Sequence, residues 1–149
     1  MPNYDAPSPI FTKVINPVVV FLVERLGLSY QGVWVLVVRA RNTGELKKVP
    51  VNLLIYQGAR YLVSPRGETQ WVRNLRAASA AELRRGNTID KVLVAEDVAE
   101  AGRPPVLRAY LQKWDSQTKA VFGFDRTATD AQLVEAAPRH PVIRLIPTV

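Results

Sequence analysis

The sequence predicts an α+β fold in which about six antiparallel strands close into a barrel and helices pack outside it. Apolar runs separated by short turns recur at 33–39, 47–56 and 60–63, which is the pattern of an antiparallel meander. Two more runs, 81–85 and 88–96, flank a Gly-Asn turn, and a last run closes the chain at 141–147. Helical segments lie between the meander, the hairpin and the last strand.

The composition limits the chemistry that the side chains can provide. With 149 residues, 48% of them apolar, the chain is expected to form one domain, 1–149, with a substantial core. It has no cysteine, which excludes disulfides, thiolate metal sites and a cysteine nucleophile. A single histidine, His140, and no carboxylate cluster leave little for a metal site or a catalytic triad. We expect no metal, and expect a cofactor to carry the chemistry if the protein is an enzyme.

The net charge of +7 implies an anionic partner. A nucleic acid, an anionic membrane surface and a multiply charged small molecule are the candidates. We disfavour nucleic acid, because no helix-turn-helix or RNP-like motif is present. The N-terminus has no secretory signal, and the apolar run 17–23 is too short to span a bilayer. We therefore expect a cytoplasmic protein and leave peripheral membrane contact open.

The N-terminal region is expected to hold an arm and a helix. Residues 1–12 are rich in proline and predict a flexible arm. A helix is predicted over 13–26, with Asn16 as N-cap, Pro17 in the first turn and Gly27 as the stop. Its apolar surface is wider than one face, so the helix is either buried or rests on an apolar partner such as lipid, and we favour burial.

The remaining elements follow from turn and helix signals. Gly44 is placed for a positive φ in the first turn, and Pro50 within the second strand predicts an edge or a bulge, where backbone and ligand often meet. Helices are predicted over 103–114, with two prolines at its start, and over 128–137. Trp34 and Trp114 are expected in the core.

The stretch from Ser64 to Ala78 is the strongest functional candidate in the sequence. A Pro-Gly loop joins the strand at 60–63 to an amphipathic helix, and a helix N-terminus offers free N–H groups and a favourable dipole to an anion. Trp71 adds a flat face and Asn74 a fixed amide. Three arginines add positive charge: Arg66, Arg73 and Arg76. These features suit a planar anion, although the same pattern fits a surface helix that buries Trp71 and leaves its arginines solvated.

The order of these signals resembles the deazaflavin-dependent nitroreductase family, actinobacterial split β-barrel proteins that use coenzyme F420, an 8-hydroxy-5-deazaflavin. The resemblance covers 16–149. It depends chiefly on RARNTGELKKVPVNLL at 39–54 and YLVSPRGETQWVRNLRAA at 61–78, with weaker matches in NPVVVFL at 16–22 and HPVIRLIP at 140–147. The fold it implies is a split barrel of the FMN-binding type with an N-terminal helix and outer helices.

The resemblance also implies a site. In such proteins the turn after the first strand and the basic start of the second hold the phosphate and oligoglutamate tail of the coenzyme. The loop before the amphipathic helix lies along the deazaflavin and its ribityl-phosphate chain, and the helix closes the pocket. The residues expected to bind the cofactor are Arg41, Lys47, Lys48, Pro50, Ser64, Pro65, Arg66, Gly67, Trp71 and Asn74.

The activity implied is hydride transfer from C5 of the reduced deazaflavin to an electron-poor acceptor such as a quinone, an enone or a nitro compound. The candidates for proton donor or substrate contact are Tyr30, Asn52, Tyr56 and Ser64. We interpret His140 as a structural hydrogen-bonding residue. The subgroup resembles monomeric split barrels more than dimeric ones, so a monomer is expected, with a small apolar acceptor as the second partner.

A second hypothesis remains open, a non-catalytic protein that binds lipid or another apolar ligand on the same fold. Asn42 stands where the family has a lysine, and Glu68 replaces a loop glycine with a charge that would repel a nearby anion. The apolar N-terminal segment also favours this alternative.

Overall fold

The structure is a computed structural model that describes residues 33–123 and 125–148, with the backbone alone over 115–122. Its strands form a closed barrel in the order β1-β2-β3-β6-β5-β4, and every pairing is antiparallel. This confirms the predicted α+β barrel of six strands. The predicted arm at 1–12 and helix at 13–26 lie outside the described residues. The strands are β1 (Val33–Arg39), β2 (Leu46–Tyr56), β3 (Ala59–Val63), β4 (Ala80–Arg85), β5 (Thr88–Asp97) and β6 (Val142–Pro147).

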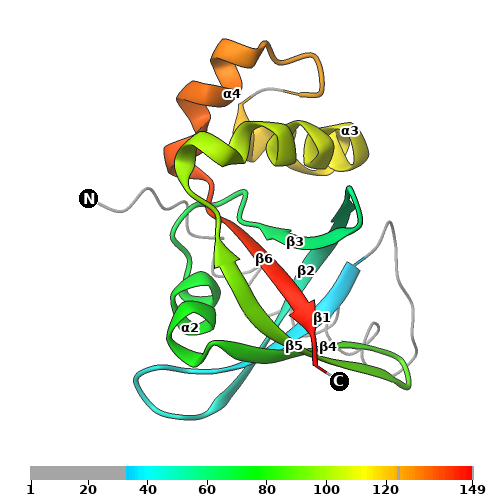
Figure 1. The fold of residues 1–149 in the computed structure, drawn as a ribbon, viewed down its shortest axis with the longest axis vertical. Helices are drawn as coiled ribbons and strands as arrows, with labels where there is room; N and C mark the ends of the chain where they lie inside the picture. Colours follow the sequence, from blue (N-terminus) through cyan, green and yellow to red (C-terminus); the bar gives the residue numbers. More distant parts are fainter. Residues whose placement is uncertain (1–32, 124, 149) are drawn as a thin grey trace.

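The helices lie outside the barrel, and they are α2 (Gln70–Ala78), α3 (Arg103–Phe122) and α4 (Asp130–Ala136), with short 3₁₀ turns η2 (Glu100–Gly102) and η3 (Ala137–Arg139). Figure 1 shows α3 and α4 together at the top of the view, and α2 apart from them on the flank of the barrel. No helix among the described residues has the length and apolar character needed to span a bilayer.

Strand β1 is buried on both of its faces. Trp34, Leu36 and Val38 point into the barrel and join its core, as the alternation of a strand requires. Val35 and Val37 point the other way and are still only 0% and 3% exposed. Burial on both sides explains why this strand is a continuous apolar run instead of an alternating one.

A second core lies between the outside of the barrel and α3. Leu54 on β2 packs in one cluster with Leu107, Tyr110, Leu111 and Trp114. The sequence predicted that this helix ends at Trp114. The structure instead has a kink there, with φ −130° and ψ 23°, and the helix resumes to Phe122. The Trp114 ring is fully buried and lies 4.9 Å from the Tyr110 ring, so the kink occurs at an anchored residue.

The turns and caps follow the predicted chemistry. Gly44 has φ +77° in the turn between β1 and β2, and Gly58 has the same φ in the next turn. Thr129 caps α4 through a reciprocal capping box with Gln132, which sets the start of that helix two residues later than predicted.

Along the first half of β2 the ladder is incomplete among the described residues. Residues 46–52 of β2 pair with β1, but β3 pairs with β2 only over 53–56. Within the described chain, one side of the first half of β2 therefore has no neighbouring strand. Pro50 lies in this half, opposite Val35 of β1, so the prediction of an edge position agrees with the structure.

Candidate functional site

One face of β2 presents a row of the predicted residues, most of them in its open half, 46–52. Because side chains alternate along a strand, Lys48, Pro50, Asn52 and Tyr56 share the face opposite to the one that enters the barrel core. The pairing of Leu53 with Leu62 places the end of β3 beside Asn52. The loop after β3 therefore begins next to the open half of β2, and the two segments flank the same break in the ladder.

The loop itself is a tight turn held by its own backbone. The buried Ser64 hydroxyl donates to the Gly67 carbonyl at 2.5 Å, and the Gly67 N–H donates back to the Ser64 carbonyl at 3.3 Å. Gly67 has φ +87°, which favours glycine at this position. The Ser64 N–H donates to the Pro141 carbonyl at 2.9 Å, so the loop is attached to the start of β6.

The N-terminus of α2 is not capped by its own N-cap residue. Thr69 has extended backbone geometry, yet its hydroxyl does not accept from the first turn. That hydroxyl is buried and has no hydrogen-bond partner within the described chain. The first-turn N–H groups of an α-helix lack intrahelical partners and carry the positive end of the dipole. The end of the loop therefore brings the Thr69 hydroxyl together with the positive end of a helix dipole, in a position that favours an anion.

Arg41 lies against α2. Its backbone N–H and its Nη1 both donate to Oδ1 of Asn74, at 3.1 and 2.8 Å. Asn74 is buried, with 5% of its surface exposed, so the amide is a fixed acceptor. This contact joins the turn between β1 and β2 to the helix that follows the loop, and it orients the guanidinium of Arg41.

The two lysines at the start of β2 are divided between its faces. Lys47 lies opposite Val38 and Lys48 opposite Val37, and these valines point to opposite sides of β1. Lys47 is exposed and pairs with Glu45 at 3.3 Å, with side chains 55% and 69% exposed. Exposed pairs of this kind contribute little energy. Lys48, and not Lys47, shares a face with Pro50 and Asn52.

The other predicted binding residues lie on or beside the loop. Pro65 and Arg66 are half-buried. Trp71 is also half-buried: it packs against the barrel core and still leaves part of its surface exposed. His140 is buried, and its Nδ1 lies 3.2 Å from the Ser64 carbonyl, which agrees with a structural role under the loop.

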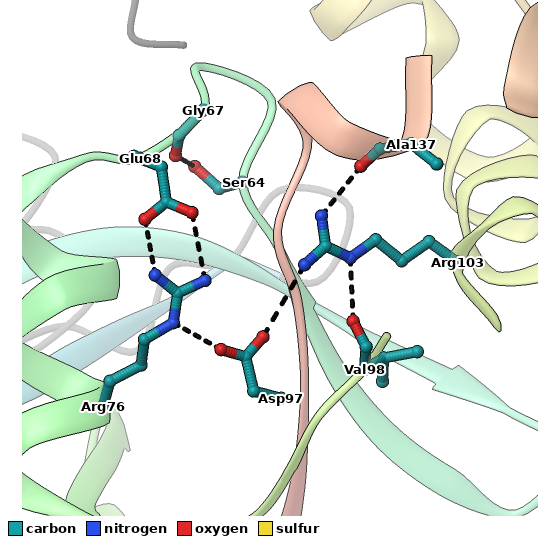
Figure 2. Close-up of polar contacts among 8 residues, drawn as sticks. All are labelled: Ser64, Gly67, Glu68, Arg76, Asp97, Val98, Arg103 and Ala137. Atoms are coloured by element: carbon teal, nitrogen blue, oxygen red, sulfur yellow. Dashed lines mark hydrogen bonds and ion pairs between the residues drawn. The ribbon is translucent and has the colours of Figure 1, made fainter. Parts of the chain in front are cut away.

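The structure corrects the sequence-based interpretation of the charges of Arg76 and Glu68. Two guanidinium nitrogens of Arg76 bind the two carboxylate oxygens of Glu68, and its Nε pairs with Asp97 (Figure 2). Burial acts to lower the pKa of Arg76, but the hydrogen bonds and charges of Glu68 and Asp97 outweigh burial and raise it. Arg76 therefore adds no free positive charge to the site, and the charge of Glu68 is compensated.

The candidates for proton donor or substrate contact differ in their surroundings. Asn52 donates from Nδ2 to the hydroxyl of Tyr110 on α3 at 3.1 Å. Tyr56 is half-buried, with its ring 6.4 Å from that of Tyr61. Ser64 is fully buried, and its hydroxyl is engaged by the Gly67 carbonyl. Tyr30 lies outside the described residues.

Tyr110 makes stability depend on pH in the alkaline range. Burial raises its pKa from 10.0 to about 12, and the bond from Asn52 opposes this only in part. The neutral hydroxyl thus favours the folded state fully below about pH 10, and this contribution is lost as the pH rises toward about 12. This contribution to the free energy of unfolding is about 2–3 kcal/mol, since each pKa unit corresponds to about 1.4 kcal/mol.

Between about pH 9 and about pH 11, the free energy of unfolding in urea should fall more for the wild type than for Tyr110→Phe. Equal losses would contradict the assignment.

A cavity of about 470 Å³ lies between α3, α4 and the end of β2. Its walls are mostly apolar, with the Arg108 to Asp130 ion pair among its lining residues. It is lined by Tyr56, Pro104, Pro105, Arg108, Ala109, Gln112, Asp130, Leu133 and Val134. Tyr56 is the one predicted site residue that contributes to it.

No group of three or more His, Asp or Glu side chains within 33–123 and 125–148 is arranged to hold a metal ion.

Sequence analysis missed three residues around the loop before α2: Thr69, Asp97 and Arg103. A threonine directly before a helical stretch is an N-cap signal and could have drawn attention to Thr69. Nothing in the sequence signalled Asp97 and Arg103, whose contacts depend on the fold.

Comparison with known proteins identifies the fold. No protein-family model matches the sequence, and no curated protein is significantly similar to it. A protein of Listeria innocua proposed to be a pyridoxamine 5′-phosphate oxidase aligns at 14% identity over 80% of this chain and 86% of its own, with a TM-score of 0.50. A protein of unknown function from Agrobacterium tumefaciens aligns at 14% identity over 95% of this chain and 59% of its own, with a TM-score of 0.52. An F420 reductase aligns at 13% identity over 97% of both chains, with a TM-score of 0.49.

These findings show the fold alone, a split β-barrel similar to that of the Listeria innocua protein.

Proposed function

We propose that the chain is an oxidoreductase that uses coenzyme F420 and transfers hydride to an electron-poor acceptor. One observation carries the proposal. Among the described residues, the break in the barrel is flanked on one side by the open half of β2. On the other side lies a loop that ends at the N-terminus of α2, where the buried Thr69 hydroxyl neither caps the helix nor has another partner in the described chain. A planar cofactor with a phosphate suits an open strand edge next to an anion-binding helix N-terminus.

The residues around the break fit the charges of this coenzyme. Its phosphate and oligoglutamate tail carry several negative charges, and charge-assisted hydrogen bonds to arginine and lysine are the strong ones. Arg41 is held in one orientation by Asn74, and Lys48 extends from the same face of β2 as Pro50. Arg66 is half-buried on the loop. The net charge of +7 agrees with a polyanionic partner.

The bound coenzyme would supply the hydride at C5 of its reduced form. The chain would bind and orient the planar ring along Pro50 and the loop, and would exclude water with Trp71. Asn52 holds the neutral hydroxyl of Tyr110, whose raised pKa suits it to donate a hydrogen bond and not to act as a base. The acceptor class that we propose is a quinone, an enone or a nitro compound.

The test is a fluorescence titration of the purified protein with oxidised coenzyme F420, with FMN in parallel because other split barrels bind ordinary flavins. We expect binding in the micromolar range or tighter for the deazaflavin and none for FMN. Binding of FMN alone would replace the cofactor in the proposal, and binding of neither would refute it. An acceptor screen with quinones, enones and nitro compounds follows a positive result.

The second candidate function is a carrier of an apolar ligand, and the cavity between α3 and α4 favours it. Its volume of about 470 Å³ is within the range of small-molecule sites, and apolar side chains form most of its wall. Mass spectrometry of an organic extract of the purified protein tests this function. A stoichiometric apolar compound, together with no response to coenzyme F420, would favour the carrier.

We also propose that the chain is one domain and acts as a monomer. Size-exclusion chromatography with light scattering should give a mass near 16.6 kDa.

A further inference from the structure

Four charged side chains from separate segments form one connected network beside the loop (Figure 2). Arg76 on α2 binds Glu68 of the loop through Nη1 to Oε2 at 2.5 Å and Nη2 to Oε1 at 3.1 Å. The Nε of Arg76 lies 2.5 Å from Oδ2 of Asp97 at the end of β5. The other oxygen of Asp97 lies 3.8 Å from Nη2 of Arg103 at the start of α3. The two positive and two negative charges of this network sum to zero.

Arg103 fixes one end of this network to the backbone. It is 8% exposed, and its Nε donates to the Val98 carbonyl and its Nη1 to the Ala137 carbonyl, both at 2.8 Å. A guanidinium held by two backbone carbonyls has little freedom to move. Asp97 consequently lies between the fixed Arg103 and Arg76. The two hydrogen bonds from Arg76 to Glu68 then connect Glu68 to the same fixed point.

Glu68 is the residue of the loop whose charge opposes the proposed function. It directly precedes Thr69, the N-cap of α2, where an anion is expected to bind. An uncompensated carboxylate at this position would repel that anion and could itself interact with the first-turn N–H groups. In the structure both of its oxygens are instead occupied by Arg76.

We propose that Arg76 is a positioning residue for the cofactor loop, because it ties Glu68 to Asp97 and cancels the charge of Glu68 beside the anion site. The inference rests on the proposed function for its effect on binding. Its mechanical part, the attachment of the Ser64 to Thr69 loop to the end of β5, does not depend on a cofactor.

A double-mutant cycle with two readouts tests the proposal. The variants are Arg76→Gln, Glu68→Gln and the combination of the two, and the readouts are coenzyme F420 affinity and hydrogen exchange of a peptide covering 64–69. Arg76→Gln should weaken binding about tenfold or more, because it leaves Glu68 uncompensated. Adding Glu68→Gln to Arg76→Gln should recover most of that loss. Loop exchange should accelerate in both single variants, since each breaks the attachment.

The matched control is the pair of Arg84 and Glu82 on β4. Arg84 binds Glu82 at 2.7 Å with a similar exposure, 24% and 30% against 31% and 25% for Arg76 and Glu68. Arg84→Gln removes the same charge and should leave the loop exchange unchanged. Adding Glu68→Gln to Arg84→Gln should recover no affinity, because Glu68 is still paired with Arg76 in that variant. This control separates the local effect of Arg76 from a general loss of positive charge.

The outcomes distinguish the inference from the proposed function. Unchanged loop exchange in Arg76→Gln would overturn the attachment, and failure of Glu68→Gln to recover affinity would overturn the charge compensation. If the wild type binds no coenzyme F420, the proposed function fails. The exchange experiment alone then decides whether Arg76 attaches the loop to β5. Faster exchange in Arg76→Gln but not in Arg84→Gln would then still support the attachment.

Discussion

Replacing Arg41 and Arg66 together by alanine is expected to weaken coenzyme F420 binding by at least about 3 kcal/mol, more than a hundredfold. Charge-assisted hydrogen bonds contribute about 1.5–3 kcal/mol each. Arg41 is oriented by Asn74 before any ligand binds, so its contact to an anion requires little ordering of the side chain. Fluorescence titration of the double variant against the wild type measures the effect.

The control for this prediction is Arg39→Ala, which removes an exposed arginine at the end of β1, two residues before Arg41. Arg39 donates to the Gly44 carbonyl and belongs to no proposed contact. Its loss should change the affinity far less than loss of Arg41 and Arg66. Thermal unfolding of each variant shows whether Asn74, deprived of its partner, has destabilised the fold. An affinity equal to that of the wild type in a folded double variant would remove the anion-binding role from both arginines.

Arg103→Met is expected to lower the free energy of unfolding by about 3 kcal/mol. The substitution keeps an apolar side chain of similar length but removes the donors to the Val98 and Ala137 carbonyls. Buried carbonyls left without partners are among the most destabilising consequences of a single substitution. Urea unfolding followed by circular dichroism measures the loss.

Arg108→Met provides the comparison for Arg103→Met on the same helix. Arg108 pairs with Asp130, whose side chain is 95% exposed, and donates to the Ala128 carbonyl at 3.0 Å. An exposed ion pair contributes about 1 kcal/mol or less. We therefore expect a clearly smaller loss of stability for Arg108→Met. Equal losses for the two variants would show that burial of Arg103 does not determine its effect.

The barrel could be predicted because its information is local. Each strand of the meander carries its own apolar pattern, and Gly44 and Gly58 mark the turns by their need for positive φ. The continuation of α3 beyond Trp114 was not predicted: no helix-breaking residue marks the kink, which falls at a tryptophan buried beside Tyr110. The edge position of Pro50 was predicted from its missing N–H group alone.

The candidate site was predictable only in part, because only its local features leave a signal in the sequence. The loop and helix from Ser64 to Ala78 carry local signals, whereas the contact of Arg41 with Asn74 spans 33 positions of the sequence. Counting charges misjudged Arg76 and Glu68, since a charge count does not reveal which charges neutralise each other. The role of Asp97 depends on the end of β5 meeting α2 and α3.

The open half of β2 also bears on aggregation. A strand side without a neighbour, as 46–52 has in the described chain, is a template for pairing with a strand of another molecule. Natural proteins discourage such pairing with proline and lysine, and Pro50, Lys47 and Lys48 all lie in this segment. Pro50 and Lys48, which we propose for cofactor binding, therefore also lie on a strand side that has no neighbouring strand among the described residues, where both disfavour pairing with another molecule. We expect neutral substitutions of the two lysines to weaken this protection whether or not a cofactor binds.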